Sequence, residues 1–173
     1  LIQLTWKENT AFVYNLATFE QVGTFSYDGE GWGLCADDQY IYMTNGTPFI
    51  LVRDRETFDL LFSLAVTLRG QVISQYVDPN NLPLGQLNEL ECVGDYLYSN
   101  IWQTQVILKI NKHNGVIEAL VDASSLGDDK QAGEEYEVAY LNGIAYLPDS
   151  DTFLVTGKYW PRMYEVTFVP KGQ

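Results

Sequence analysis

The chain has 173 residues, 46% of them hydrophobic and 14% aromatic, which is the composition of one globular domain with a substantial core. A net charge of −13, with only 10 Lys and Arg residues, excludes the basic face that nucleic-acid binding requires. One His and two Cys exclude a His-based metal centre and a structural zinc site, and no stretch approaches the roughly 18 apolar residues of a membrane span. We therefore expect neither a nucleic-acid partner nor a membrane.

The predicted elements are short strands in regular groups. Residues 1–28 supply about three strands of an incomplete sheet, 29–68 and 87–126 each supply four, and 127–173 supply the last three and the end of the fold. Residues 69–86, rich in Pro, Asn, Gly and Gln, predict an inserted loop between sheets. The later strands are expected at 33–36, 40–45, 47–54, 59–66, 89–93, 96–102, 104–111, 116–123, 143–147, 152–160 and 161–169.

These groups repeat one plan. Cys35 and Cys92 occupy matching positions 57 residues apart, and Ala145 follows 53 residues after Cys92. Repeats of roughly this length, made of four strands joined by hairpin turns such as Asn114-Gly115, indicate an all-β β-propeller in a single domain. The chain accounts for about three and a half blades. Because propellers close with four to eight blades, we expect it to be the C-terminal part of a larger ring. Either another segment completes the ring or the fold is irregular.

Matching repeat positions of a propeller meet at one mouth of its channel. Trp32, Glu89 and Gly143 share one opening position, and Gly31, Asn88 and Asn142 share the position before it. The ends of second strands carry Trp6, Trp102 and the run from Lys158 to Trp160. Each type also has a structural interpretation: Trp packs between sheets, Lys is solvated at a strand end, and Asn forms turns.

Glu89 and Glu91 are two residues apart, which places both on one face of a strand. Two carboxylates on a face that points into a channel repel unless a cation or a hydrogen-bond donor lies between them. The sequence therefore leaves open a divalent cation in the channel or a solvated rim. Asn45 begins an Asn-Gly-Thr glycosylation pattern, which the following Pro48 weakens.

Six motifs occur in an order that resembles a known family. They are LTWK (4–7), GEGWGL (29–34), NELE (88–91), NIWQT (100–104), NGIAY (142–146) and TGKYWP (156–161). The chain resembles the plant and bacterial glutaminyl-peptide cyclotransferases, which are five-bladed propellers, over all but residues 69–86. The resemblance implies conversion of an N-terminal Gln of a peptide to pyroglutamate with release of ammonia. It also implies that catalysis requires no cofactor.

The resemblance implies that certain residues of this chain line a substrate pocket. Its residues would be Trp6, Trp32, Asn88, Trp102 and Lys158, with Glu89, Glu91, Asn142 and Trp160 as further candidates. Indole rings would enclose the stem of the Gln side chain, and their N–H groups could donate to its oxygens. Lys or Asn would stabilise the developing oxyanion.

The family's proton-shuttling Glu would precede Leu1, so we expect a separate N-terminal segment to supply it, and the catalytic acid–base residue of this chain stays unassigned. Glu30 resembles that residue locally but belongs to the next blade. The rival interpretation is a non-catalytic propeller that binds a peptide or small ligand at the same aromatic mouth. An ammonia-release assay on a Gln-initiated peptide separates the two.

Cys35 and Cys92 lie on matching inner strands of neighbouring blades. A disulfide between them is the favoured interpretation, and two buried thiols are the alternative. A disulfide would imply a secreted, lumenal or periplasmic protein.

Overall fold

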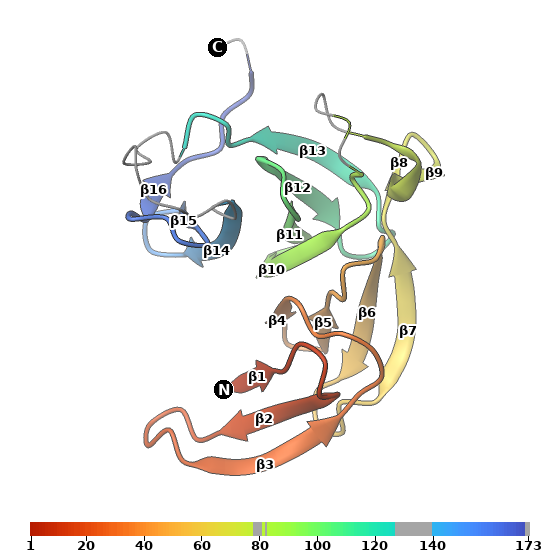
Figure 1. Ribbon diagram of the computed structural model, residues 1–173, viewed down its shortest axis with the longest axis vertical. Coiled ribbons are helices and arrows are strands. Elements are labelled where there is room, and N and C mark those ends of the chain that lie inside the picture. The colour runs from red at the N-terminus through yellow and green to blue at the C-terminus, as the bar shows by residue number, and fades with distance from the viewer. Residues whose placement is uncertain (78–80, 82, 127–139, 172–173) are drawn as a thin grey trace.

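The computed structural model describes residues 1–77, 81, 83–126 and 140–171, and in these parts the regular secondary structure is almost entirely β-strand. Figure 1 shows four antiparallel sheets whose strands follow in chain order. The first sheet contains β1 (Ile2–Leu4), β2 (Thr10–Tyr14) and β3 (Gln21–Ser26). The second contains β4 (Leu34–Ala36), β5 (Tyr40–Met43), β6 (Phe49–Asp54) and β7 (Leu60–Ala65). The third contains β10 (Leu87–Val93), β11 (Tyr96–Ile101), β12 (Val106–Asn111) and β13 (Ile117–Asp122), and the fourth contains β14 (Leu141–Leu147), β15 (Thr152–Gly157) and β16 (Tyr164–Val166).

The sheets lie around a common centre as the blades of a β-propeller, with β4, β10 and β14 on the inner side (Figure 1). Each predicted strand is present, because period-2 patterns of apolar residues and Gly/Asn/Asp turns fix hairpins locally. Among the described residues, no helix is long and apolar enough to cross a membrane.

The segment 69–86 differs from the loop that we expected. Its described part contributes to a small hairpin of β8 (Thr67–Leu68) and β9 (Gln71–Val72), followed by the 3-10 turn η1 (Ile73–Gln75). Ile73 and Leu84 are buried in the core between the second and third sheets. Apolar residues scattered among the turn formers thus fold this segment back onto the sheets.

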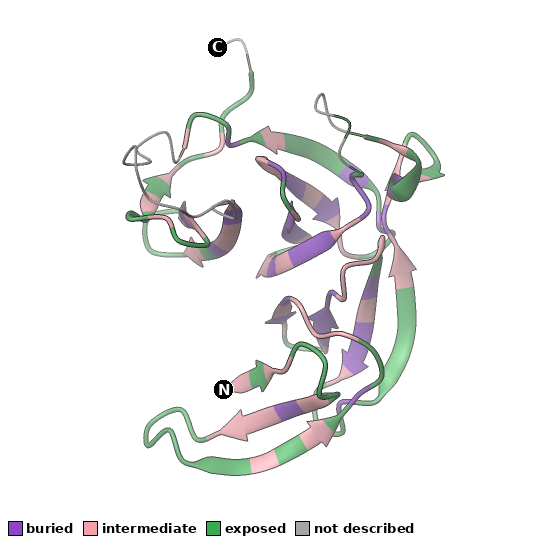
Figure 2. Ribbon diagram, viewed as in Figure 1, coloured by how far each residue is buried: buried purple, intermediate pink, exposed green. Residues whose placement is uncertain are grey.

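The core consists of layers between neighbouring sheets (Figure 2). One layer between the first two sheets includes Met43 and Phe58, and the next includes Ile50, Leu90 and Leu108. A third layer, with Leu141 and Val155, joins the third and fourth sheets. Packing between sheets therefore fixes the positions of the loops at their ends.

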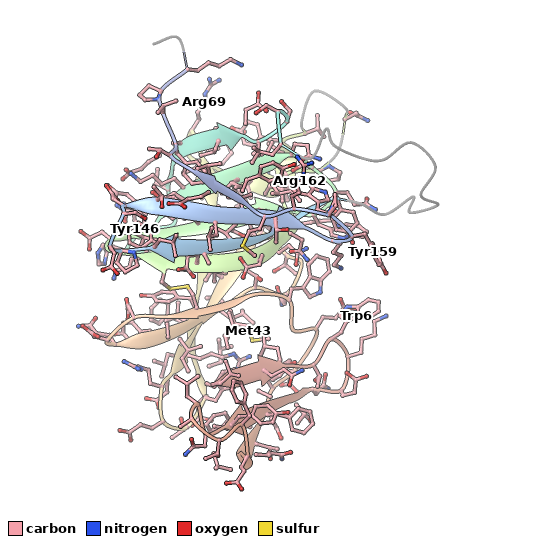
Figure 3. The ribbon with its side chains drawn as sticks, turned by 90° about the vertical axis from the view of Figure 1, so that its left-hand side faces the viewer. Trp6, Met43, Arg69, Tyr146, Tyr159 and Arg162 are labelled. Atoms are coloured by element: carbon pink, nitrogen blue, oxygen red, sulfur yellow. A yellow bond between two sulfur atoms is a disulfide. The ribbon has the colours of Figure 1, made fainter. Side chains whose placement is uncertain are left out.

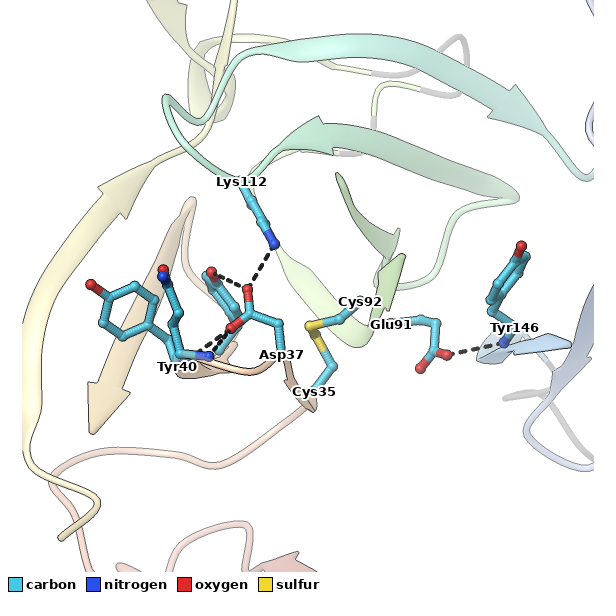
Figure 4. The surroundings of a disulfide bond; sticks show 9 residues. Cys35, Asp37, Tyr40, Glu91, Cys92, Lys112 and Tyr146 are labelled. Atoms are coloured by element: carbon cyan, nitrogen blue, oxygen red, sulfur yellow. Dashed lines mark hydrogen bonds and ion pairs between the residues drawn. A yellow bond between two sulfur atoms is a disulfide. The ribbon is translucent and has the colours of Figure 1, made fainter. Parts of the chain in front are cut away.

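A disulfide joins the second and third sheets. Cys35 on β4 and Cys92 on β10 are bonded, with their Cα atoms 5.6 Å apart (Figure 4), which confirms the predicted pair. Nearby, Lys112 Nζ lies 2.8 Å from Asp37 Oδ2. Burial alone would raise the pKa of Asp37, but the Lys112 ammonium and the N–H of Tyr40 outweigh it and hold that pKa well below its usual range.

Candidate functional site

Four sequence-predicted side chains leave their sheets at the same end. Trp6 follows β1, Trp32 precedes β4, Trp102 follows β11 and Lys158 follows β15. Because the hairpins are antiparallel, the start of a first strand and the end of a second strand share one end of a sheet. β1, like β11, precedes the last two strands of its sheet, so it occupies the second-strand position of an incomplete blade. In the side view of Figure 3, Trp6 lies toward this end and Tyr146 toward the other.

Glu30 holds the first two indoles together. Its Oε2 accepts the Nε1–H of Trp6 at 2.7 Å and that of Trp32 at 2.8 Å, and Lys7 Nζ lies 3.9 Å from Oε1. The Trp32 and Trp6 hydrogen bonds, with the charge of Lys7, lower the pKa of this exposed carboxyl. Glu30 is therefore an anion at neutral pH that orients two rings.

Trp32 then contacts Trp102 of the next sheet. The ring centroids are 5.9 Å apart with planes at 66°, an edge-to-face arrangement. The Trp32 ring lies against Gly46, where an added Cβ would meet ring carbons at 2.6 Å. Gly46 also has a positive φ of 75°, so both the ring and the backbone require glycine here.

Tyr140 connects Trp102 to Lys158. Its hydroxyl oxygen accepts the Trp102 Nε1–H at 2.9 Å and a proton of Lys158 Nζ at 3.3 Å. The Lys158 backbone N–H also donates to the Tyr140 carbonyl at 2.9 Å. The Tyr140 ring meets Trp102 edge to face at 6.2 Å.

These contacts form one continuous set of side chains across all four sheets, which we call the aromatic series. Its members are Trp6, Glu30, Trp32, Trp102, Tyr140 and Lys158. Protein acceptors already take the indole N–H groups of Trp6, Trp32 and Trp102, contrary to the expectation that these groups donate to substrate. The sequence did not reveal those acceptors. Because the three N–H groups are already bonded, the indole rings can serve as apolar walls of the pocket.

Asn88 lies on the inner strand β10, where the register with β11 shifts between Leu87 and Leu90. It is buried, and its carbonyl accepts the Thr44 hydroxyl of the second sheet. Asn100, also buried, bridges this irregular stretch to β14: its Oδ1 accepts the Glu89 N–H at 3.0 Å and its Nδ2 donates to Leu141 O at 2.7 Å. Bulges commonly re-aim side chains beside functional sites.

Glu89 and Glu91 join the third sheet to the fourth. Glu89 Oε2 accepts the Ile144 N–H at 3.1 Å, and Glu91 Oε1 accepts the Tyr146 N–H at 3.0 Å (Figure 4 shows the second contact). Burial raises the pKa of Glu89 to about 7 and also raises that of Glu91. The sequence left open whether a cation or a hydrogen-bond donor lies beside these two carboxylates, and the structure places backbone N–H donors there. In the described parts of the chain, no group of three or more His, Cys, Asp or Glu side chains could hold a metal.

Asn142 and Trp160 lie in the fourth sheet and just after β15. The register of β14 with β15 shifts between Leu141 and Ile144, as it does at the matching place in β10. Asn142 Oδ1 and Trp160 Nε1 are buried and have no hydrogen-bond partner among the described residues. Trp160 packs on Gly157 and meets the ring of Tyr164 edge to face, so its ring belongs to the fourth sheet.

A cavity of about 630 Å³ lies at the other end of the β4–β5 hairpin from Trp32. Tyr40, Phe62, Lys112 and His113 are among its lining residues. Two of its charged lining residues form the Asp37–Lys112 pair, which joins neighbouring sheets. No motif in the sequence predicted this cavity, because its lining comes from separate turns.

Glu30 and Tyr140 are the members of the aromatic series that sequence reasoning missed. Glu30 was visible in GEGWG, two residues before Trp32, a spacing that could have signalled a contact. Tyr140 lies just before β14 and outside every predicted strand, and no periodic signal marks it.

Comparisons with known proteins bear on the family and the fold of the chain. The sequence profile of the glutamine cyclotransferase family matches residues 1–168. A glutaminyl-peptide cyclotransferase of Arabidopsis thaliana is 28% identical over 167 residues, covering 96% of this chain and 49% of that protein, so the chain spans about half the length of this relative. The crystal structure of Myxococcus xanthus glutaminyl cyclase superposes with a TM-score of 0.84 at 32% identity, covering 98% of this chain and 69% of that one. The WD40 β-propeller domain of Doa1, at 10% identity and a TM-score of 0.56 over 98% of this chain and 47% of its own, supports the fold alone. Because the family profile extends over nearly the whole chain, the chain belongs to the glutamine cyclotransferase family.

Proposed function

We propose that the protein carrying this chain is a glutaminyl-peptide cyclotransferase, which converts the N-terminal Gln of peptides to pyroglutamate and ammonia. The observation that carries the proposal is the aromatic series, which links four predicted substrate residues from separate sheets at one end of the propeller. Family membership and the named relatives support the same activity.

The reaction needs a curled substrate. The α-amino nitrogen attacks the γ-carboxamide carbon, a C–N bond forms, and the bond from that carbon to the amide nitrogen then breaks as ammonia leaves. We assign Trp6, Trp32 and Trp102 to the walls that hold the Gln side chain in this conformation. Asn88 remains a proposed substrate residue near the same end.

Lys158 would supply positive charge beside the carboxamide oxygen. An ammonium has three N–H donors, and one is directed at Tyr140, so others remain for a ligand. Donors that meet a developing oxyanion stabilise the transition state more than the ground state.

We assign no proton carrier among these residues. Hydrogen bonds to Trp32 and Trp6 keep Glu30 anionic, and backbone N–H groups of β14 engage Glu89 and Glu91. We propose that Glu30 orients the pocket rings without exchanging protons with substrate.

Incubation of the intact protein with a Gln-initiated peptide tests the proposal, with ammonia release as the readout and the N-acetylated peptide as a control that cannot cyclise. We expect turnover of the free peptide alone. We further expect Trp102→Ala and Lys158→Ala each to lower kcat/KM by at least about 10-fold while the protein stays folded by circular dichroism. Binding of the peptide without ammonia release would instead support a non-catalytic binding propeller.

The disulfide is a bond that persists in oxidising compartments, so we propose a secreted, lumenal or periplasmic location. A divalent cation in the channel remains a proposal from the sequence pattern of Glu89 and Glu91. Metal analysis of the purified protein after dialysis tests it, and a metal-free protein of unchanged stability would contradict it.

A further inference from the structure

The Tyr140 hydroxyl is approached by two side chains that can only donate. The indole N–H of Trp102 has no lone pair to offer, and the Lys158 ammonium has only protons. Their nitrogen atoms lie 2.9 Å and 3.3 Å from the same phenolic oxygen. A tyrosine hydroxyl has two lone pairs and one proton, so these contacts occupy both lone pairs.

The proton of Tyr140 must therefore point in a third direction. In the described part of the chain, no side chain or carbonyl accepts it. Tyr140 is half-buried beside Trp102 and Lys158, at the end of the sheets where the aromatic series lies. An O–H donor is thus held there by two neighbours, and no acceptor for it lies among residues 1–77, 81, 83–126 and 140–171.

The arrangement matches an oxygen that gains negative charge. The Tyr140 oxygen and Lys158 Nζ are 3.3 Å apart, so one acceptor atom can lie within hydrogen-bond distance of both. Two donors that converge on one oxygen, fixed before the ligand arrives, are the requirement for stabilising an oxyanion.

We propose that Tyr140 is a substrate-contacting residue that donates its O–H, beside Lys158, to the γ-carbonyl oxygen of the N-terminal Gln. The proposal rests on the proposed cyclotransferase function. As the amine nitrogen bonds to the carbonyl carbon, the π electrons of the C=O bond move to its oxygen, which accepts both hydrogen bonds. When the C=O bond re-forms, the bond to the departing nitrogen breaks. That nitrogen leaves as ammonia with the proton that the attacking amine gives up, and Tyr140 keeps its own proton throughout.

Tyr140→Phe removes the hydroxyl and keeps the ring that contacts Trp102. We expect it to lower kcat/KM for a Gln-initiated peptide by about 10- to 100-fold, mostly through kcat. Tyr146→Phe is the matched control, because Tyr146 belongs to the same sheet at its other end and donates to Asp151 at 2.8 Å. Equal rates for the Tyr140 variant and wild type would overturn the proposal.

Direct binding separates a contact with the ligand from mere support of Trp102 and Lys158. The two ligands are a pyroglutamyl peptide and the same peptide beginning with Pro, whose ring lacks the lactam carbonyl. By calorimetry we expect Tyr140→Phe to raise the Kd of the pyroglutamyl peptide by about fivefold or more and to leave the Kd of the prolyl peptide unchanged.

Equal weakening of both peptides, or no binding of the pyroglutamyl peptide to wild type, would refute the contact. This measurement needs no turnover. A wild-type protein that releases no ammonia would contradict the proposed function, whereas the comparison of the two peptides judges Tyr140 by itself.

Discussion

Glu89 allows a quantitative test of how the third and fourth sheets are held together. Its carboxylate extends from β10 to the N–H of Ile144 on β14, parallel to the contact of Glu91 with Tyr146. Glu89→Gln keeps an acceptor oxygen for Ile144 and removes the ionisable group. The variant therefore isolates the free energy of ionising Glu89 between the sheets.

The sign follows from the direction of the pKa change. Burial raises the pKa of Glu89 from 4.5 to about 7; the N–H groups of Ile144 and Leu90 oppose the rise, and the charge of Glu91 adds to it. Between these two values the folded protein binds more protons than the unfolded chain, so its stability falls as pH rises through this range. At about 1.4 kcal/mol per pKa unit, the difference between 4.5 and about 7 corresponds to about 3 kcal/mol.

Urea unfolding at pH 5, 6, 7 and 8, followed by Trp fluorescence, measures this free energy. We expect wild type and Glu89→Gln to be similar at pH 5, and the variant to be more stable by up to about 3 kcal/mol at pH 8. Glu56→Gln, on an exposed turn, is the control and should follow wild type at every pH. A difference between wild type and Glu89→Gln that stays constant from pH 5 to 8 would refute the reasoning.

Two further substitutions test the aromatic series. We expect Glu30→Ala to lower kcat/KM for ammonia release by about 10-fold, because Trp6 and Trp32 lose their shared acceptor, whereas Glu30→Gln keeps an oxygen for both indoles and most of the activity. Equal losses in the two variants would show that the charge of Glu30 matters and its orientation of the rings does not. We expect Gly46→Ala to be less stable in urea than Gly29→Ala by about 1 kcal/mol or more, since both glycines have positive φ but only at Gly46 would a Cβ meet the Trp32 ring. Matching midpoints would contradict that packing.

The sequence predicted the elements that depend on local chemistry. Alternating apolar residues and turn residues such as Asn114-Gly115 place strands and hairpins within a few residues of their observed positions. The repeat also predicted the disulfide between Cys35 and Cys92, because matching positions on inner strands become neighbours around the centre. The disulfide could be predicted from the repeat spacing alone, without any knowledge of side-chain contacts.

Hydrogen-bond partners across sheets could not be predicted in this way. The interaction of Tyr140 with Trp102 joins residues 38 positions apart, and Tyr140 lies just before β14, outside every predicted strand. The direction of the Glu89 and Glu91 side chains likewise depends on how β10 is positioned against β14. These two strands are linked by carboxylate-to-backbone hydrogen bonds and not by a ladder of backbone hydrogen bonds, so the sequence carries no periodic signal of their register. Such contacts between sheets decide which polar atoms remain available to a ligand.

The aromatic series crosses three joints between sheets, and the last two of them are fastened by different chemistry. The Trp32–Trp102 contact crosses from the second sheet to the third, whose inner strands share the disulfide. The contact of Trp102 with Tyr140 crosses toward the fourth sheet, where Glu89 bridges the inner strands. A disulfide does not titrate, whereas burial raises the pKa of Glu89 to about 7, so we expect a change of pH near neutrality to act on the last joint. Tyr140 and Lys158 lie beyond that last joint, so we expect their positions to respond to the ionisation of Glu89. Trp6 and Trp32 instead share Glu30, whose lowered pKa keeps it an anion in this pH range.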